Sequence, residues 1–127
     1  MRYSSERGQT LVESSLVLGV LMMVLLGVFD LGRAFYAQNV IANAAREGAR
    51  YAIVQPDDTA GITDATKAKV IGLNTDELSV GASWPEPDAI RVEVTYDFHV
   101  ATALIAGFLG GGDSLQLRSA ATMYVEQ

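Results

Sequence analysis

The pattern of apolar residues marks a first element near the start of the chain. Fourteen consecutive residues from Leu16 to Phe29 carry no polar side chain. Extended back to Leu11, the run has nineteen residues and includes Glu13 and two serines. As an α-helix, nineteen residues span roughly 28 Å, close to the hydrocarbon core of about 30 Å. We therefore predict a membrane-spanning helix over residues 9–29.

Two other interpretations of this run are open. A cleavable secretory signal usually lacks an internal Glu and ends in a small-x-small site soon after the run. Here helical character continues past Asp30, and the triplet Ala42-Asn43-Ala44 comes more than a dozen residues later. A buried core helix of a soluble protein is less favoured still, because the run is apolar all round. The pattern therefore favours a retained membrane helix.

After Phe29 the helix pattern becomes amphipathic without a breaker. Mostly small residues recur at spacings of three and four, namely Ala34, Ala37, Ile41, Ala45, Gly48 and Ala52. The pattern ends at Gln55, because a residue before proline avoids the α region. We predict one helix from about residue 9 to 54, with 30–54 as its amphipathic continuation. The seam of small residues on this helix allows close packing against a sheet or a neighbouring helix. Alternatively, the seam packs only on the chain's own C-terminal domain.

Other spacings along this helix indicate local contacts. Two acids lie three residues before a basic residue, the favourable order for a helical ion pair: Asp30 before Arg33, and Glu47 before Arg50. Within the apolar run, a serine and two glycines share one slowly drifting face: Ser15, Gly19 and Gly27. These small residues either let helices approach closely in lipid or reflect the ordinary composition of a membrane helix.

Residues 55–127 alternate between apolar and polar positions, as half-buried strands do. A short helix is predicted over Asp64–Leu73, with Thr63 or Asp64 as its cap, after a loop over residues 57–61. Strands are predicted over Leu78–Trp84, Ile90–Val100 and Leu115–Val125, with a turn at 85–88 and an apolar connection at 101–109. Meander order implies an antiparallel sheet with one apolar face. The predicted fold class is α+β: a long N-terminal helix packed on a small sheet of about three strands.

Charge and composition exclude some partners and sites, and they predict an orientation of the chain in the membrane. The net charge is −6, which argues against a nucleic-acid partner, and the absence of cysteine excludes disulfides and thiolate metal sites. From Gln55 onward there are eleven Asp/Glu and four Lys/Arg, whereas the first eight residues carry a balance of +1. A basic start before an apolar run predicts a cytoplasmic N-terminus and an extracytoplasmic head domain, residues 55–127.

The candidate chemistry of the head is sparse. His99, on the polar face of a strand, has no nucleophile or acid partner with sequence support. Gly110–Gly112 lacks the lysine and following helix of a phosphate loop and is typical of a hairpin or bulge. Asp57, Asp58 and Asp64 match no calcium-loop spacing, and Trp84 is expected in the core or at its rim. We predict no enzymatic activity, no cofactor and no metal site.

Three motifs carry a family likeness: Arg7-Gly8-Gln9-x-x-x-Glu13, then Asp30-Leu31-Gly32-Arg33-Ala34, then the string from Asn43 to Ala52, NAAREGARYA. Over residues 6–54 the chain resembles the TadE-like family, the minor pilins or pseudopilins of tight-adherence (Tad/Flp) type IVc pilus systems. The resemblance implies a type IV pilin-like fold. The positions that match the family motif are Asp30, Gly32, Arg33, Asn43, Arg46, Glu47, Gly48 and Arg50.

The resemblance also implies a processing route and a location. Residues 1–8 would be a cytoplasmic leader, removed by a prepilin peptidase that cuts after Gly8 and leaves Gln9 as the first mature residue. The chain would be a single-pass protein of the cytoplasmic (inner) membrane, with its C-terminal domain outside and incorporation into an extracellular pilus as a further step. Its implied partners are other pilin subunits through helix–helix packing, the peptidase, the inner-membrane assembly platform and membrane lipid.

Glu13, the fifth mature residue in this scheme, has a physical rationale. A charged carboxylate costs about 2.5–3.5 kcal/mol at the centre of a membrane helix, and less near its end. The amine created by cleavage of one subunit could meet Glu13 of a neighbour and offset that cost. Alternatively, Glu13 snorkels to the headgroups. Two other functions stay open: an unprocessed single-pass protein with a ligand- or partner-binding domain, and a secreted binding domain released by signal peptidase.

Overall fold

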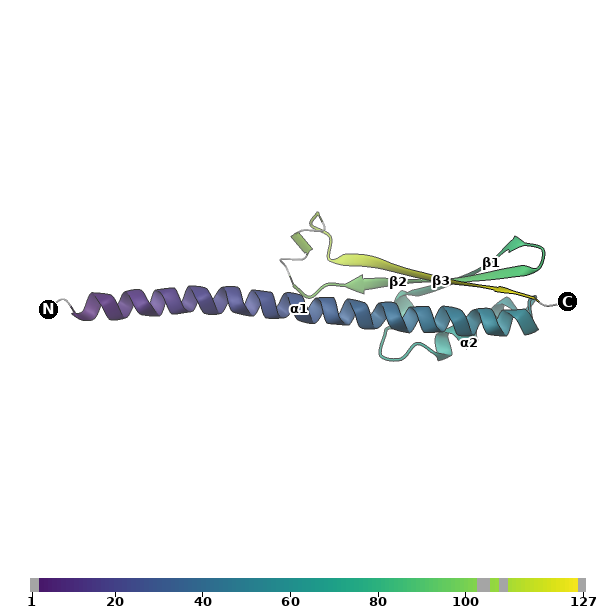
Figure 1. The fold of residues 1–127 in the computed structure, drawn as a ribbon, viewed down its shortest axis with the longest axis horizontal. Helices are drawn as coiled ribbons and strands as arrows, with labels where there is room; N and C mark the ends of the chain where they lie inside the picture. The colour runs from purple at the N-terminus through teal and green to yellow at the C-terminus, as the bar shows by residue number, and fades with distance from the viewer. Residues whose placement is uncertain (1–2, 103–105, 108–109, 126–127) are drawn as a thin grey trace.

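The computed structural model describes residues 3–102, 106–107 and 110–125, with the backbone alone for residues 3–6. A single helix, α1 (Tyr3–Val54), runs the length of the molecule, and the rest of the chain lies along its second half (Figure 1). Its 52 residues correspond to about 78 Å. It ends where predicted but begins six residues earlier, and it passes through Gly8 without a break.

The second helix, α2 (Thr59–Ala68), lies earlier in the chain than predicted. Its cap is Asp58, whose Oδ1 accepts a hydrogen bond from the N–H of Gly61 at 2.9 Å. The prediction of Thr63 or Asp64 as the cap, and of a loop through Gly61, was therefore wrong. The physical reason is local: an aspartate already available after the Pro56 turn satisfies one of the free N–H groups of the first helical turn and starts the helix there.

Three strands form an antiparallel meander in the order β1-β2-β3, as predicted. A short 3₁₀ turn, η1 (Thr75–Glu77), precedes β1 (Leu78–Glu86). The other strands are β2 (Ala89–His99) and β3 (Ser114–Tyr124). Each strand lies within two residues of its predicted bounds, and the predicted α+β fold is confirmed. Of the connection predicted at 101–109, residues 103–105 and 108–109 lie outside the described part of the chain.

The core forms where the sheet covers α1. The inward residues of β2 are all buried: Ile90, Val92, Val94, Tyr96 and Phe98. They meet fully buried residues of the small-residue seam of α1, namely Ala37, Ile41, Ala45 and Ala52, together with Ala49. On the other side of α1, α2 contributes the buried Ile62 (Figure 1). The seam therefore packs on the chain's own C-terminal domain.

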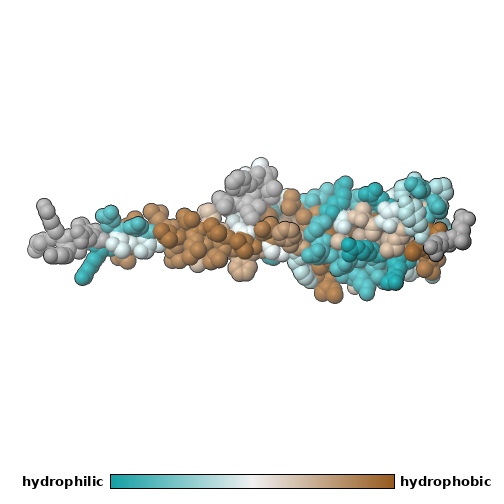
Figure 2. All heavy atoms as spheres, viewed as in Figure 1, coloured by the Kyte–Doolittle hydropathy of each residue, from teal (hydrophilic) through white to brown (hydrophobic). Residues whose placement is uncertain are grey.

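The first half of α1 has no cover. Every large apolar side chain from Leu11 to Phe29 is exposed, and they form a continuous hydrophobic band in Figure 2. Among the described residues, α1 is a helix long and apolar enough to cross a membrane, and none of its most apolar stretch is buried. A helix with this surface is suited to membrane anchoring, because lipid would shield from water the apolar side chains that the rest of the protein leaves exposed.

The polar residues singled out in the head have structural roles. His99 is half exposed and lies 3.4 Å from Glu77, between Nε2 and Oε1. Gly110 and Gly111 adopt φ values of +81° and +86° in the connection before β3, which a side chain would disfavour. Trp84 is about half exposed, near the β1–β2 turn, whereas Tyr96 is buried.

Candidate functional site

The residues of the predicted processing site share one face of α1. Gly8, Gln9 and Glu13 line a shallow, open groove on the helix surface, together with Val12 and Leu16. All five are exposed. A Cβ atom added at Gly8 would meet no atom within 4 Å, so nothing in this chain's packing requires a glycine there.

Glu13 is an exposed carboxylate amid apolar side chains. Within the described residues it forms no ion pair, since the carboxylates that do so are Asp30, Glu77 and Glu93. The nearby Ser15 hydroxyl is satisfied by its own helix, because it donates to the Leu11 carbonyl at 2.7 Å. Glu13 thus lies on the same helix face as Gly8 and Gln9, exposed and without an ion pair among the described residues.

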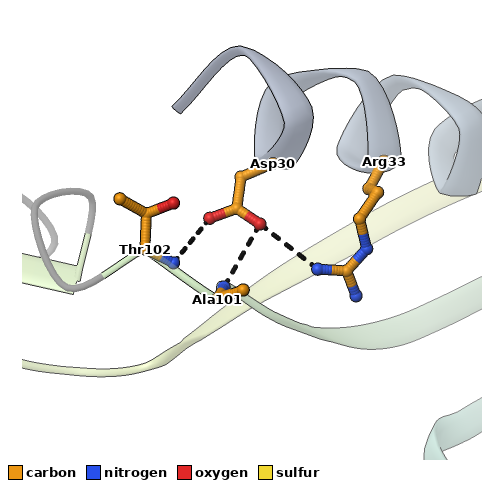
Figure 3. A network of polar contacts seen from close by, with 4 residues as sticks. All are labelled: Asp30, Arg33, Ala101 and Thr102. Carbon is orange, nitrogen blue, oxygen red and sulfur yellow. Dashed lines mark hydrogen bonds and ion pairs between the residues drawn. The ribbon is translucent and has the colours of Figure 1, made fainter. Parts of the chain in front are cut away.

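Asp30 lies where the bare half of α1 meets the head, and it is 3% exposed. Its Oδ1 accepts from the N–H of Ala101 at 3.2 Å, and its Oδ2 accepts from the N–H of Thr102 at 2.7 Å (Figure 3). The Arg33 guanidinium donates to Oδ1 at 3.2 Å, which confirms the predicted i,i+3 pair. One carboxylate therefore ties α1 to the chain directly after β2, more than seventy residues away.

The surroundings of Asp30 favour its charged form. Its pKa is lowered below the ordinary value of 3.8, first by the Thr102 side chain and then by the N–H groups of Ala101 and Thr102 and by Arg33, against the opposing effect of burial. The Thr102 hydroxyl faces the carboxylate in Figure 3. It is nevertheless buried without a well-aligned hydrogen bond in the described part of the structure. Its contribution is therefore that of a nearby dipole rather than of a strong hydrogen bond.

Arg33 joins the same junction from its exposed side. Its side chain is 57% exposed, and its guanidinium lies 5.2 Å from the centre of the Phe98 ring. An exposed ion pair and an exposed cation–π contact each contribute about 0.5–1 kcal/mol at most. Neighbouring Gly32 is exposed, and a Cβ there would meet nothing within 4 Å. Arg33 therefore assists the junction, whereas Asp30 makes it.

Gly48 occupies the closest approach of three elements. A Cβ at this position would collide with Thr66 Oγ1 of α2 and would lie 3.1 Å from Val92 Cγ1 of β2. Thr66 is fully buried, and its hydroxyl donates to the Ile62 carbonyl at 2.7 Å. Only a residue without a side chain fits between α2 and the sheet here. The packing of the head therefore accounts for this motif position.

The remaining motif positions face the open side of α1. The Arg46 guanidinium donates to Asn43 Oδ1 at 3.2 Å, and both residues are exposed, as is Arg50. Among the described residues, Glu47 and Arg50 form no ion pair, so the predicted second i,i+3 pair is not made. The motif thus divides into members that pack the head and members that leave a polar helix face free.

A side-chain contact that the sequence did not predict closes the turn after α1. The Tyr51 hydroxyl donates to Asp58 Oδ2 at 2.9 Å. The pKa of Asp58 is lowered by the N–H of Gly61 and then by this hydroxyl, and the hydrogen bond to Asp58 raises the pKa of Tyr51. An aspartate three residues before the N–H group that donates to it is a capping pattern. That signal was present at Asp58 but competed with the later Thr63 and Asp64.

These features define a class of protein. A long helix, bare and apolar in its first half and covered by a three-stranded meander in its second, is consistent with a pilin-like α+β fold. The model of the TadE-like protein family matches residues 8–50, so the resemblance expected from the sequence is confirmed over this part of the chain. Neither the curated proteins nor the solved structures give a match to the chain.

Proposed function

We propose that this protein is a minor pilin or pseudopilin that takes part in the assembly of a tight-adherence (Tad/Flp) pilus used for adhesion. The TadE-like match over residues 8–50 supports an association with such a pilus. The observation that carries the finer role is Glu13, a carboxylate without an ion-pair partner in the described chain, on the same helix face as Gly8. In a simple membrane anchor, neither Gly8 nor Glu13 would have a role.

The proposed route begins with insertion into the cytoplasmic membrane, with the N-terminus inside and the head outside. A prepilin peptidase then cleaves the bond between Gly8 and Gln9. The new amine at Gln9 is a cation in a low-dielectric environment, where attraction to a carboxylate is strong. Glu13 of a neighbouring subunit binds it and sets the axial register as subunits are added at an inner-membrane assembly platform.

Processing is tested by the mass of the mature chain. When the full-length protein is expressed with a prepilin peptidase, we expect a chain that begins at Gln9, and we expect Gly8→Ala to stay uncut. Because a Cβ at Gly8 meets no atom of this chain, the loss of cleavage would reflect the peptidase site rather than folding. The measurement is intact mass with N-terminal sequencing.

Gly19→Ala is the matched control, since Gly19 is another glycine of α1 with no atom near its Cβ position. It should be cut like the wild type. A wild-type chain that begins at Met1 would support the unprocessed single-pass protein instead. A start beyond residue 36 would support a secreted domain released by signal peptidase.

The role of Glu13 is tested separately from cleavage. Glu13→Ala should be cut and inserted at wild-type levels but should fail to assemble, because an amine left without its carboxylate partner in a buried pair costs about 3–5 kcal/mol per subunit contact. The readout is the amount of this subunit in sheared pili and in subunit–subunit cross-links. Ser14→Ala, at the adjacent exposed position, should assemble normally. Normal piliation by Glu13→Ala would show that Glu13 only snorkels to the headgroups.

A further inference from the structure

The apolar surface of α1 does not stop at the predicted end of the membrane span. Beyond Phe29, Leu31 is 56% exposed and Phe35 is 63% exposed. They border a groove of about 170 Å³ between α1 and β3, lined by Leu31, Ala34, Phe35, Gln38 and Leu117. In Figure 2 the hydrophobic surface of the bare helix reaches the base of the head. The groove is thus continuous with the membrane-anchoring surface.

The position of the groove places it at the membrane surface. Leu31 and Phe35 lie two and six residues after Phe29, or about 3 Å and 9 Å further along the helix. The polar headgroup zone on each side of a bilayer is roughly 5–8 Å thick. If residues 9–29 cross the hydrocarbon core, the groove opens at the level of the glycerol and headgroups. Phe29, Phe35 and Tyr36 are all exposed there, as aromatic residues at membrane interfaces are.

The polar side chain that lines the groove is already engaged within the chain, because Gln38 Nε2 donates to the Arg118 carbonyl at 3.1 Å. The other residues that line the groove are apolar. The groove therefore favours a hydrocarbon chain over a hydrogen-bonding partner.

We propose that this groove binds a phospholipid of the outer leaflet of the membrane. The upper part of an acyl chain lies against Leu31, Phe35 and Leu117. The head of the membrane-inserted protein then rests on the bilayer on its β3 side instead of projecting freely. This inference depends on anchoring by α1 and is independent of cleavage after Gly8.

Tryptophan placed at two heights on α1 tests the proposal. Because the chain has one tryptophan, Trp84→Phe gives a silent background. In that background, Phe35→Trp and the matched control Asn43→Trp, two turns further from the membrane, are reconstituted as full-length chains in phosphatidylcholine–phosphatidylglycerol vesicles. Lipids brominated near the glycerol end of the acyl chain should quench the Phe35→Trp emission several-fold more than that of Asn43→Trp. Equal quenching, or none, would overturn the proposal.

A second copy of the chain is the competing occupant, and dilution separates the two. Lipid contact predicts quenching that is unchanged as the protein-to-lipid ratio falls. Quenching that appears only on dilution would show that another copy covers the groove, and it would overturn lipid binding.

Retention of phosphatidylglycerol by the detergent-extracted protein, measured by native mass spectrometry, gives a further readout. Phe35→Ser should reduce it several-fold, and Ile71→Ser, which alters another exposed apolar side chain outside the groove lining, should not. Because neither side chain belongs to the core, both variants should fold. Unchanged retention in Phe35→Ser would also overturn the proposal.

Discussion

Gly48→Ala is expected to destabilise the head by about 1–3 kcal/mol, although alanine is the better helix former. The added methyl would collide with the buried Thr66 hydroxyl and press on Val92. Neither neighbour can withdraw freely, because Thr66 is held by its hydrogen bond to Ile62 and Val92 is fully buried. α1, α2 and the sheet would have to move apart, which loosens the core on both sides of α1.

The measurement is thermal unfolding of the detergent-solubilised full chain, followed by Trp84 emission. A change of 1 kcal/mol corresponds to roughly 4–8 °C for a domain of this size. Gly32→Ala is the control on the same helix, since its Cβ would meet nothing, and it should stabilise by about 0.5–1 kcal/mol. The cost of Gly48→Ala should shrink in a Thr66→Ala background, because the colliding oxygen is then absent. A stabilised Gly48→Ala would contradict the packing seen here.

Regular periodicity explains why the main elements could be predicted. The strict alternation along β2, from Ile90 to Phe98, allows one apolar face, and that face is buried. The small-residue seam of α1 likewise indicated a closely packed neighbour. That neighbour is the chain's own sheet, which was one of three interpretations that the sequence left open. Periodicity indicates which face of a helix is buried, but it does not indicate which element covers that face.

The contacts that could not be predicted depend on residues far apart in the chain. Gly48 looked like one more small residue of the seam until α2 and β2 were placed on either side of it. Asp30 looked like half of a local ion pair with Arg33. Its main partners are backbone N–H groups at Ala101 and Thr102, and such groups leave no mark in a sequence. The start of α2 was missed for a different reason, because three nearby residues all suit a cap.

The open positions on α1 are informative because packing does not explain them. Gly8, Glu13 and Gly32 have exposed surroundings, and the exposed Arg46 donates a hydrogen bond to its helix neighbour Asn43. All five lie within residues 8–50, where the TadE-like match falls. Gly48 and Asp30, in the same match, serve the head. One helix thus combines residues that build the fold with residues that are free for another molecule.

Asp30→Ala is expected to be the most damaging single change at the junction, at about 2–5 kcal/mol. It removes the acceptor of two backbone N–H groups, and a buried donor left unsatisfied costs about 1–3 kcal/mol. The chain after β2 should then separate from α1. Amide hydrogen exchange at Ala101 and Thr102 should become faster, while exchange in the centre of β2 changes less. Arg33→Gln, which removes only the exposed partner, should cost less than about 1 kcal/mol.

Asp30→Asn isolates the charge, because the amide keeps one acceptor oxygen and the shape of the side chain. The pKa of Asp30 is lowered on folding, so its charged form stabilises the native state at pH values above the ordinary carboxyl pKa of 3.8. That contribution is lost as the pH falls through the folded-state pKa. The stability difference between the wild type and Asp30→Asn, measured by denaturant unfolding, should therefore be constant near neutral pH and shrink below about pH 4. A difference that stays constant into acid would show that the Asp30 carboxylate does not hold the head to α1 through its charge.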